Sequence, residues 1–164
     1  MQHTVLVSLW AIFVAGILLY LWMAQTFLAD RQLAIGAGFE QATRLFLWFL
    51  TFVDIATLLW WKRRFLTPQA ILSGAKRYKL LQALQEHKGA AEERAGAAVT
   101  SYVTGKIVAF ALAEAVAIYG FTFVLTSRYF VGQYILSAAS GLLLVLEFPS
   151  RRVLSELIGA AQAD

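Results

Sequence analysis

The 164-residue sequence contains no cysteine, and it has only two prolines and two histidines. The absence of cysteine excludes a disulfide framework, a thiolate nucleophile and a thiolate-bound metal. The histidines, His3 and His87, are far apart in the sequence, and His87 lies in a charged segment. We therefore expect no catalytic triad, no metal site and no cofactor within this chain, and we predict that it is not an enzyme.

Several sequence motifs with a known chemistry are also missing. There is no P-loop, no G-x-G-x-x-G, no H-E-x-x-H and no G-x-S-x-G sequence. A net charge of +4 is compatible with nucleic-acid binding, but the basic segment offers no aromatic stacking platform beyond Tyr78. We expect no nucleic-acid partner.

Charged residues are scarce and apolar residues abundant, at 15% and 60% of the chain, against about 25% and about 45–50% in soluble domains. The mean hydropathy is +0.66. Four apolar runs are long enough to cross a bilayer, and each must be helical because lipid cannot satisfy backbone polar groups. The sequence predicts one all-α membrane domain over residues 1–164, with spans at 4–24, 45–61, 106–126 and 129–147.

The connections predict two antiparallel helix hairpins. The third and fourth spans are joined by a few residues around Ser127, and the first two by about 20 residues. Of the 14 basic residues, all but Arg31, Arg44 and Arg128 fall on the side that holds both termini and the segment 62–105. The positive-inside rule then places both termini in the cytoplasm, as expected for a protein of the bacterial inner membrane.

Segment 62–105 is predicted to be a basic, helical cytoplasmic arm that joins the two hairpins. Thr67 and Pro68 are typical of a helix N-cap and first helical position, and 90–104 is predicted to continue as a helix into the third span. Two interpretations remain open: an amphipathic helix on an anionic membrane surface, or a solvated arm that contacts a protein partner. The residues expected to contact lipid headgroups or a partner are Lys62, Arg63, Arg64, Lys76, Arg77 and Lys79.

Two carboxylates lie well inside the predicted spans, Glu114 and Asp54. A charge at the centre of a membrane helix costs about 2.5–3.5 kcal/mol on insertion scales, so such residues usually have a partner or a purpose. Antiparallel pairing about Ser127 places Glu114 level with Ser140. One interpretation is a proton or ion site, and the other is a protonated carboxyl group that binds helices together. The candidates for this site are Glu114, Asp54, Ser140, Ser137 and Gln133.

Small residues line one side of the third span and recur in the fourth. Such small-xxx-small spacing permits close approach of two helices. It predicts a helix interface, either within the chain or with another subunit or a second copy. The residues are Ala109, Ala113, Ala117, Gly120 and Gly141.

Residues 111–120, ALAEAVAIYG, give the third span a local resemblance to a known family. The stretch 106–125 resembles the carboxylate-bearing helix of the c-type proteolipid subunits of rotary ATP synthases. The resemblance implies that Glu114 binds a proton or sodium ion and that Tyr119 packs nearby. Outside this stretch the chain does not match that family, because residues 76–96, which precede the third span, are too polar to span a membrane as the glycine-rich inner helix does.

Two functions follow as predictions. The first is a small, non-catalytic membrane subunit that scaffolds, anchors or stabilises a larger membrane complex. The second is a proton- or ion-binding oligomer that uses Glu114 and Asp54. In both, the expected partners are the lipid bilayer and either other membrane subunits or further copies of the chain.

Overall fold

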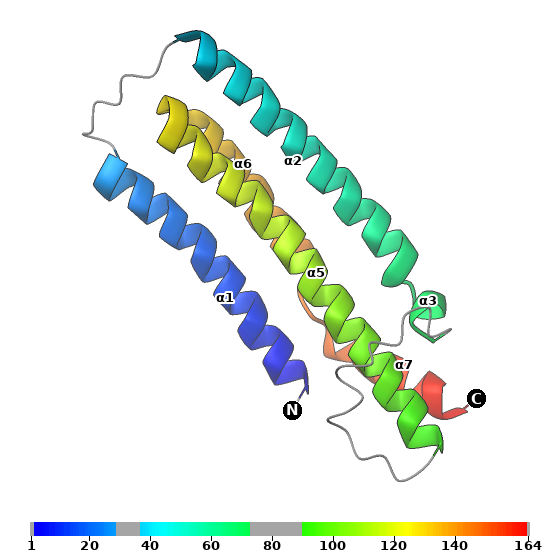
Figure 1. The fold of residues 1–164 in the computed structure, drawn as a ribbon. Coiled ribbons are helices and arrows are strands. Elements are labelled where there is room, and N and C mark those ends of the chain that lie inside the picture. Colours follow the sequence, from blue (N-terminus) through cyan, green and yellow to red (C-terminus); the bar gives the residue numbers. More distant parts are fainter. Residues whose placement is uncertain (1, 29–36, 73–89, 164) are drawn as a thin grey trace.

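The computed structural model describes residues 2–28, 37–72 and 90–163, which are almost entirely helical and contain no strand. In Figure 1 the long helices α1, α2 and α5 run side by side, together with the shorter α6. The elements are α1 (Gln2–Met23), the π-helical turn η1 (Ala24–Leu28), α2 (Ala37–Phe65), α3 (Pro68–Leu72), α5 (Ala90–Ser127), α6 (Phe130–Leu146) and α7 (Arg151–Ala163).

Four of these helical regions are long and apolar enough to cross a membrane. They cover His3–Thr26, Gln41–Phe65, Ala98–Ser127 and Phe130–Glu156. The prediction of an all-α protein is confirmed for the described residues, and so is the presence of four helices long and apolar enough to span a membrane.

Helix α5 is the centre of the bundle, because α1, α2, α6 and α7 all pack against it. Helices α1 and α2 lie on either side of α5 in Figure 1, and both make their main contacts with α5 rather than with each other. One apolar cluster joins α5 to α1 around Ile17 and Phe110, and a second joins α5 to α2 around Leu47 and Val116.

Helix α5 ends in a left-handed (αL) C-cap, with Arg128 at the C′ position. The N–H of Arg128 donates to the carbonyl of Val124 at 3.1 Å, and the N–H of Tyr129 donates to that of Phe123 at 3.4 Å. Arg128 has a φ of 52°, in the left-handed region where a side chain costs about 1–2 kcal/mol. This turn folds α6 back along α5.

The predicted small residues of α5 are used for packing within the chain. Ala109, Ala113 and Ala117 are fully buried. A Cβ placed on Gly120 would lie 3.1 Å from the Cβ of Leu136 on α6, so the backbones approach closely there. Gly141 differs, because a Cβ added to it meets nothing within 4 Å.

Two predictions for segment 62–105 are confirmed. The Thr67 hydroxyl accepts a hydrogen bond from the N–H of Ala70 at 3.3 Å, as an N-cap does. Helix α5 begins at Ala90 and continues without a break into the third span. Residues 73–89, which include the predicted contact residues Lys76, Arg77 and Lys79, lie outside the described part of the chain.

Helix α7 was not predicted from the sequence. It follows the fourth span and packs Leu154 and Ile158 against Ala98 and Val99, near the start of α5. Helices α3 and α7, both chain termini and the start of α5 gather at one end of the bundle (Figure 1).

Candidate functional site: polar groups within the helical bundle

Glu114 lies on the side of α5 that faces α1, and its partner is Tyr20. The Tyr20 hydroxyl donates to the Glu114 carboxylate at 3.1 Å. Gly16, one turn earlier on α1, makes room for this carboxylate, because a Cβ on Gly16 would lie only 2.5 Å from Glu114 Oε1. The absence of a side chain at position 16 is therefore part of the Glu114 site.

Asp54 lies on α2 and bonds a different tyrosine. The Tyr119 hydroxyl donates to the Asp54 carboxylate at 2.8 Å. The two acids predicted to form one polar site thus join different pairs of helices: Glu114 joins α5 to α1, and Asp54 joins α2 to α5. Each carboxylate has its own phenol donor.

The polar residues of α6 reach the same region of the bundle. Ser140 does not bond Glu114; its hydroxyl donates to the carbonyl of the adjacent Ala113 at 2.6 Å. Gln133 is fully buried, and its amide nitrogen donates to the Tyr20 carbonyl at 3.1 Å. Tyr20 is consequently held through both its backbone and its hydroxyl, and its ring stacks on Phe121 with centroids 5.7 Å apart.

Glu147 is a third acid, which the sequence analysis missed. Its side chain is only 4% exposed, and its two carboxylate oxygens lie 2.6 Å from Lys62 Nζ and 2.7 Å from Lys106 Nζ. Lys106 also donates to the Glu147 carbonyl at 3.1 Å. The carboxylate therefore joins α2, α5 and the end of α6.

The signal for this ion pair was present in the sequence. The antiparallel pairing that brings Ser140 to Ala113 also brings Glu147 to Lys106, because Glu147 lies about two helical turns after Ser140 and Lys106 about two turns before Ala113. Lys106 and Glu147 lie at the edges of the apolar runs, outside the residues for which the sequence predicted an intramembrane partner.

Of the basic residues predicted to contact lipid or a partner, Lys62 instead reaches Glu147, although its side chain is still 49% exposed. Arg63 and Arg64 follow in the last turn of α2 and are exposed. Beside them, the Trp61 indole donates to the Gly105 carbonyl at 3.2 Å, which fixes the end of α2 on α5.

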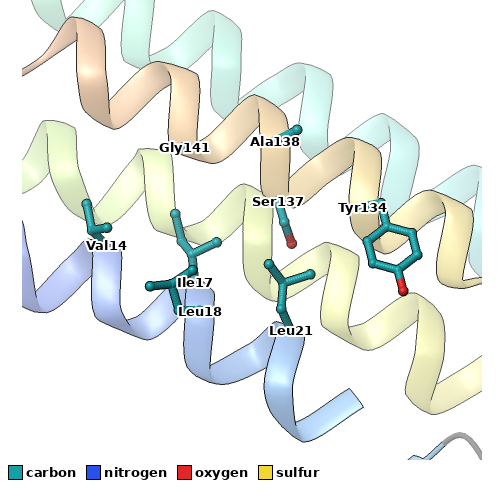
Figure 2. A pocket seen from close by; sticks show the side chains of 8 residues that line it. All are labelled: Val14, Ile17, Leu18, Leu21, Tyr134, Ser137, Ala138 and Gly141. Carbon is teal, nitrogen blue, oxygen red and sulfur yellow. The ribbon is translucent and has the colours of Figure 1, made fainter. Parts of the chain in front are cut away.

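An apolar groove of about 290 Å³ lies between α1 and α6 (Figure 2). Its α1 wall consists of aliphatic residues between Val14 and Leu21. The residues that line it on α6 are Tyr134, Ser137, Ala138 and Gly141. Neither Glu114 nor Asp54 lines this groove.

The arrangement suits hydrogen bonding and proton binding better than metal binding. Within residues 2–28, 37–72 and 90–163, no three His, Asp or Glu side chains come together as metal ligands would. A tyrosine hydroxyl can donate to a carboxylate and can accept from a carboxylic acid. The Glu114 and Asp54 sites are thus compatible with either protonation state of the acid.

Comparison with known proteins gives no relative from which a function could be transferred: no protein family, curated protein or solved structure matches the chain.

Proposed function

We propose that this chain is a small, non-catalytic membrane subunit that scaffolds, anchors or stabilises a larger membrane complex. The observation that supports this most is that three acidic side chains in the bundle each connect two helices. Glu114, Asp54 and Glu147 each bond a side chain on a neighbouring helix. Polar groups that are costly in a membrane thereby hold helices together, which is what a scaffold requires.

In the proposed arrangement the chain lies in the bacterial inner membrane, with α6 folded back on α5 as a hairpin, α1 and α2 on either side of α5, and segment 62–105 in the cytoplasm. The excess of basic residues around 62–105 and after the fourth span supports this orientation. The grouping of α3, α7 and both termini at one end of the bundle agrees with it (Figure 1). The exposed Arg63 and Arg64 would then face anionic headgroups or a cytoplasmic partner.

A second candidate function is proton or ion binding at Glu114 by an oligomer of this chain, with Asp54 as a second acid. Its specific support is the space that Gly16 leaves for the Glu114 carboxylate, together with a phenol donor that tolerates either protonation state. Against it, the groove between α1 and α6 does not reach either acid. A conducting site needs an access path as well as a carboxylate.

Two substitutions of Glu114 distinguish the scaffold function from the ion-binding function. Glu114→Gln keeps the shape and a hydrogen-bond acceptor for Tyr20 but cannot ionise, whereas Glu114→Ala removes the contact. We expect Glu114→Gln to preserve the size of the complex isolated from native membranes in mild detergent, and Glu114→Ala to reduce the fraction assembled. The exposed Glu156 provides the matched control, because Glu156→Gln also removes a carboxylate but should leave assembly unchanged.

Proton flux into liposomes made with the purified complex gives the opposing readout. If Glu114→Gln abolished a flux shown by the unmodified chain while the complex stayed intact, the scaffold function would be wrong. If Glu114→Ala prevented assembly while any flux persisted, the ion-binding function would be wrong.

A further inference from the structure

Two arginines lie at the turn between α5 and α6, at the end of the bundle opposite both chain termini (Figure 1). Arg44 of α2 donates from its Nε to the Ser127 hydroxyl at 3.3 Å, and its guanidinium group lies 4.8 Å from the centre of the Tyr129 ring. Arg128 is the residue between these two contacts in the sequence. This end of the bundle carries only three of the 14 basic residues, so two of the three belong to one short turn.

Arg128 pairs with no carboxylate among the residues that the structure describes. Its side chain is partly exposed. The guanidinium atoms Nε and Nη2 are covered by the chain and have no acceptor, so Nη1 is the nitrogen left to bind a group outside the bundle. A charged group that is partly removed from water and has no acceptor is costly. An anion bound at Nη1 would offset this cost through a charge-assisted hydrogen bond.

The depth of the turn indicates which anion is available. From Lys106, at one edge of the third span, to Ser127, helix α5 rises about 32 Å at 1.5 Å per residue, which matches the hydrocarbon thickness of about 30 Å. Only Arg128 and Tyr129 separate α5 from α6, so this connection does not extend far beyond the membrane. Both arginines therefore lie at the level of the lipid phosphates. Their combined positive charge favours a lipid with a net negative charge over a zwitterionic lipid.

We propose that the α5–α6 turn binds the phosphate group of an anionic phospholipid, with Arg128 Nη1 donating to a phosphate oxygen and Arg44 supplying a second positive charge. Ser127 and Tyr129 hold Arg44 at the turn for this role. The bound lipid fixes the depth of the α5–α6 hairpin at the membrane surface opposite the chain termini. This site goes beyond the scaffold function and does not depend on it, because a single copy of the chain contains the whole site.

Photo-cross-linking of the full chain tests the site. The chain is reconstituted in phosphatidylcholine liposomes that contain a trace of phosphatidylglycerol with a photoreactive headgroup, and the labelled peptides are quantified by mass spectrometry. We expect Arg128→Asn to reduce the label on the turn peptide about tenfold, the factor that corresponds to about 1.4 kcal/mol. Arg44→Gln should reduce it less, by about threefold, because a nearby charge contributes less than a charge-assisted hydrogen bond.

Three controls separate loss of the site from loss of the fold. Asparagine tolerates the φ of 52° at position 128, so Arg128→Asn should unfold in lipid-free detergent at no lower temperature than the parent. Arg152→Asn removes an arginine that is paired with Glu156 on α7, and it should leave the label at the turn unchanged. The label on peptides from the opposite end of the bundle should be the same in Arg128→Asn and in the parent.

Competition identifies the ligand. Excess unlabelled phosphatidylglycerol should remove the label at the turn. Dioleoylglycerol, which lacks a phosphate, and inorganic phosphate, which lacks acyl chains, should not. If inorganic phosphate competed as well as phosphatidylglycerol, the site would bind a free anion and the lipid assignment would be wrong. The proposal would also be wrong if Arg128→Asn kept the label of the parent, or if its label fell equally at both ends of the bundle.

Discussion

The acids of the bundle are held differently at the end near α7 and near the middle. At the end of the bundle near α7, Glu147 is paired with two ammonium groups, those of Lys62 and Lys106. Near the middle, Glu114 and Asp54 are each bonded to one neutral phenol. Both arrangements join α5 to its neighbours, but only the first depends on charge.

This difference indicates that the chain accommodates a permanent positive charge at the edge of a span but not in its middle. A lysine at the edge of a span can keep its side chain in contact with water, and Lys62 remains half exposed while it pairs with Glu147. No lysine in the middle of the bundle could reach water in this way. A tyrosine there supplies a donor without adding a second charge to the membrane interior.

The largest expected effect is at the Glu147 site. Glu147→Gln leaves Lys106, whose side chain is 11% exposed, as a buried charge without its counter-ion. Breaking a buried pair in this way costs about 3–5 kcal/mol. Denaturant unfolding in detergent should show this loss, and replacing both partners in Lys106→Met/Glu147→Met should recover most of it.

The control for this prediction is Glu156→Gln, which removes a carboxylate from the exposed pair with Arg152 and should leave stability unchanged. If the Glu147→Gln variant were as stable as the Glu156→Gln variant, the buried Glu147 ion pair would contribute no more stability than the exposed Glu156 pair.

A smaller loss is expected where Glu114 meets Gly16. Gly16→Ala inserts a methyl group into the space of the carboxylate, and overpacking of this kind costs about 1–3 kcal/mol. The double variant Gly16→Ala/Glu114→Ala should recover stability, because the added methyl group then has room. Gly141→Ala is the matched control, since it adds the same methyl group to open space.

The smallest effect concerns the phenols. Tyr119→Phe and Tyr20→Phe each delete one donor to a carboxylate, and interhelical hydrogen bonds in membranes average about 0.6 kcal/mol. The same unfolding measurement should give the two variants similar stabilities, both well above the stability of Glu147→Gln. If Tyr119→Phe lost as much unfolding free energy as Glu147→Gln, the distinction between the charged end and the middle of the bundle would be contradicted.

The sequence predicts the four apolar spans, the Thr67 cap and the continuity of α5, because these depend on local composition and periodicity. It also predicts that Ser140 lies level with Glu114, since a short turn fixes the register of α6 on α5. The partners of Glu114 and Asp54 could not be predicted in this way. Tyr20 and Tyr119 meet them across helices whose connections are too long to set a register.

Helix α7 could have been predicted, because Leu154 and Ile158 recur at helical spacing after the last span. The groove at Ser137 could not. Small residues at helical spacing occur on both sides of α6, and only the packed structure shows that Ser140 has a partner and Ser137 has none.

The unbroken length of α5 has a mechanical consequence. Its 38 residues extend about 57 Å, whereas the hydrocarbon core is about 30 Å thick, so a substantial part of one rigid rod projects beyond the membrane beside α7. Without a proline in α5, the rod has no built-in kink between Ala98 and Glu114. Because α5 is one continuous helix, a tilt of its N-terminal part would also tilt the segment that carries Glu114.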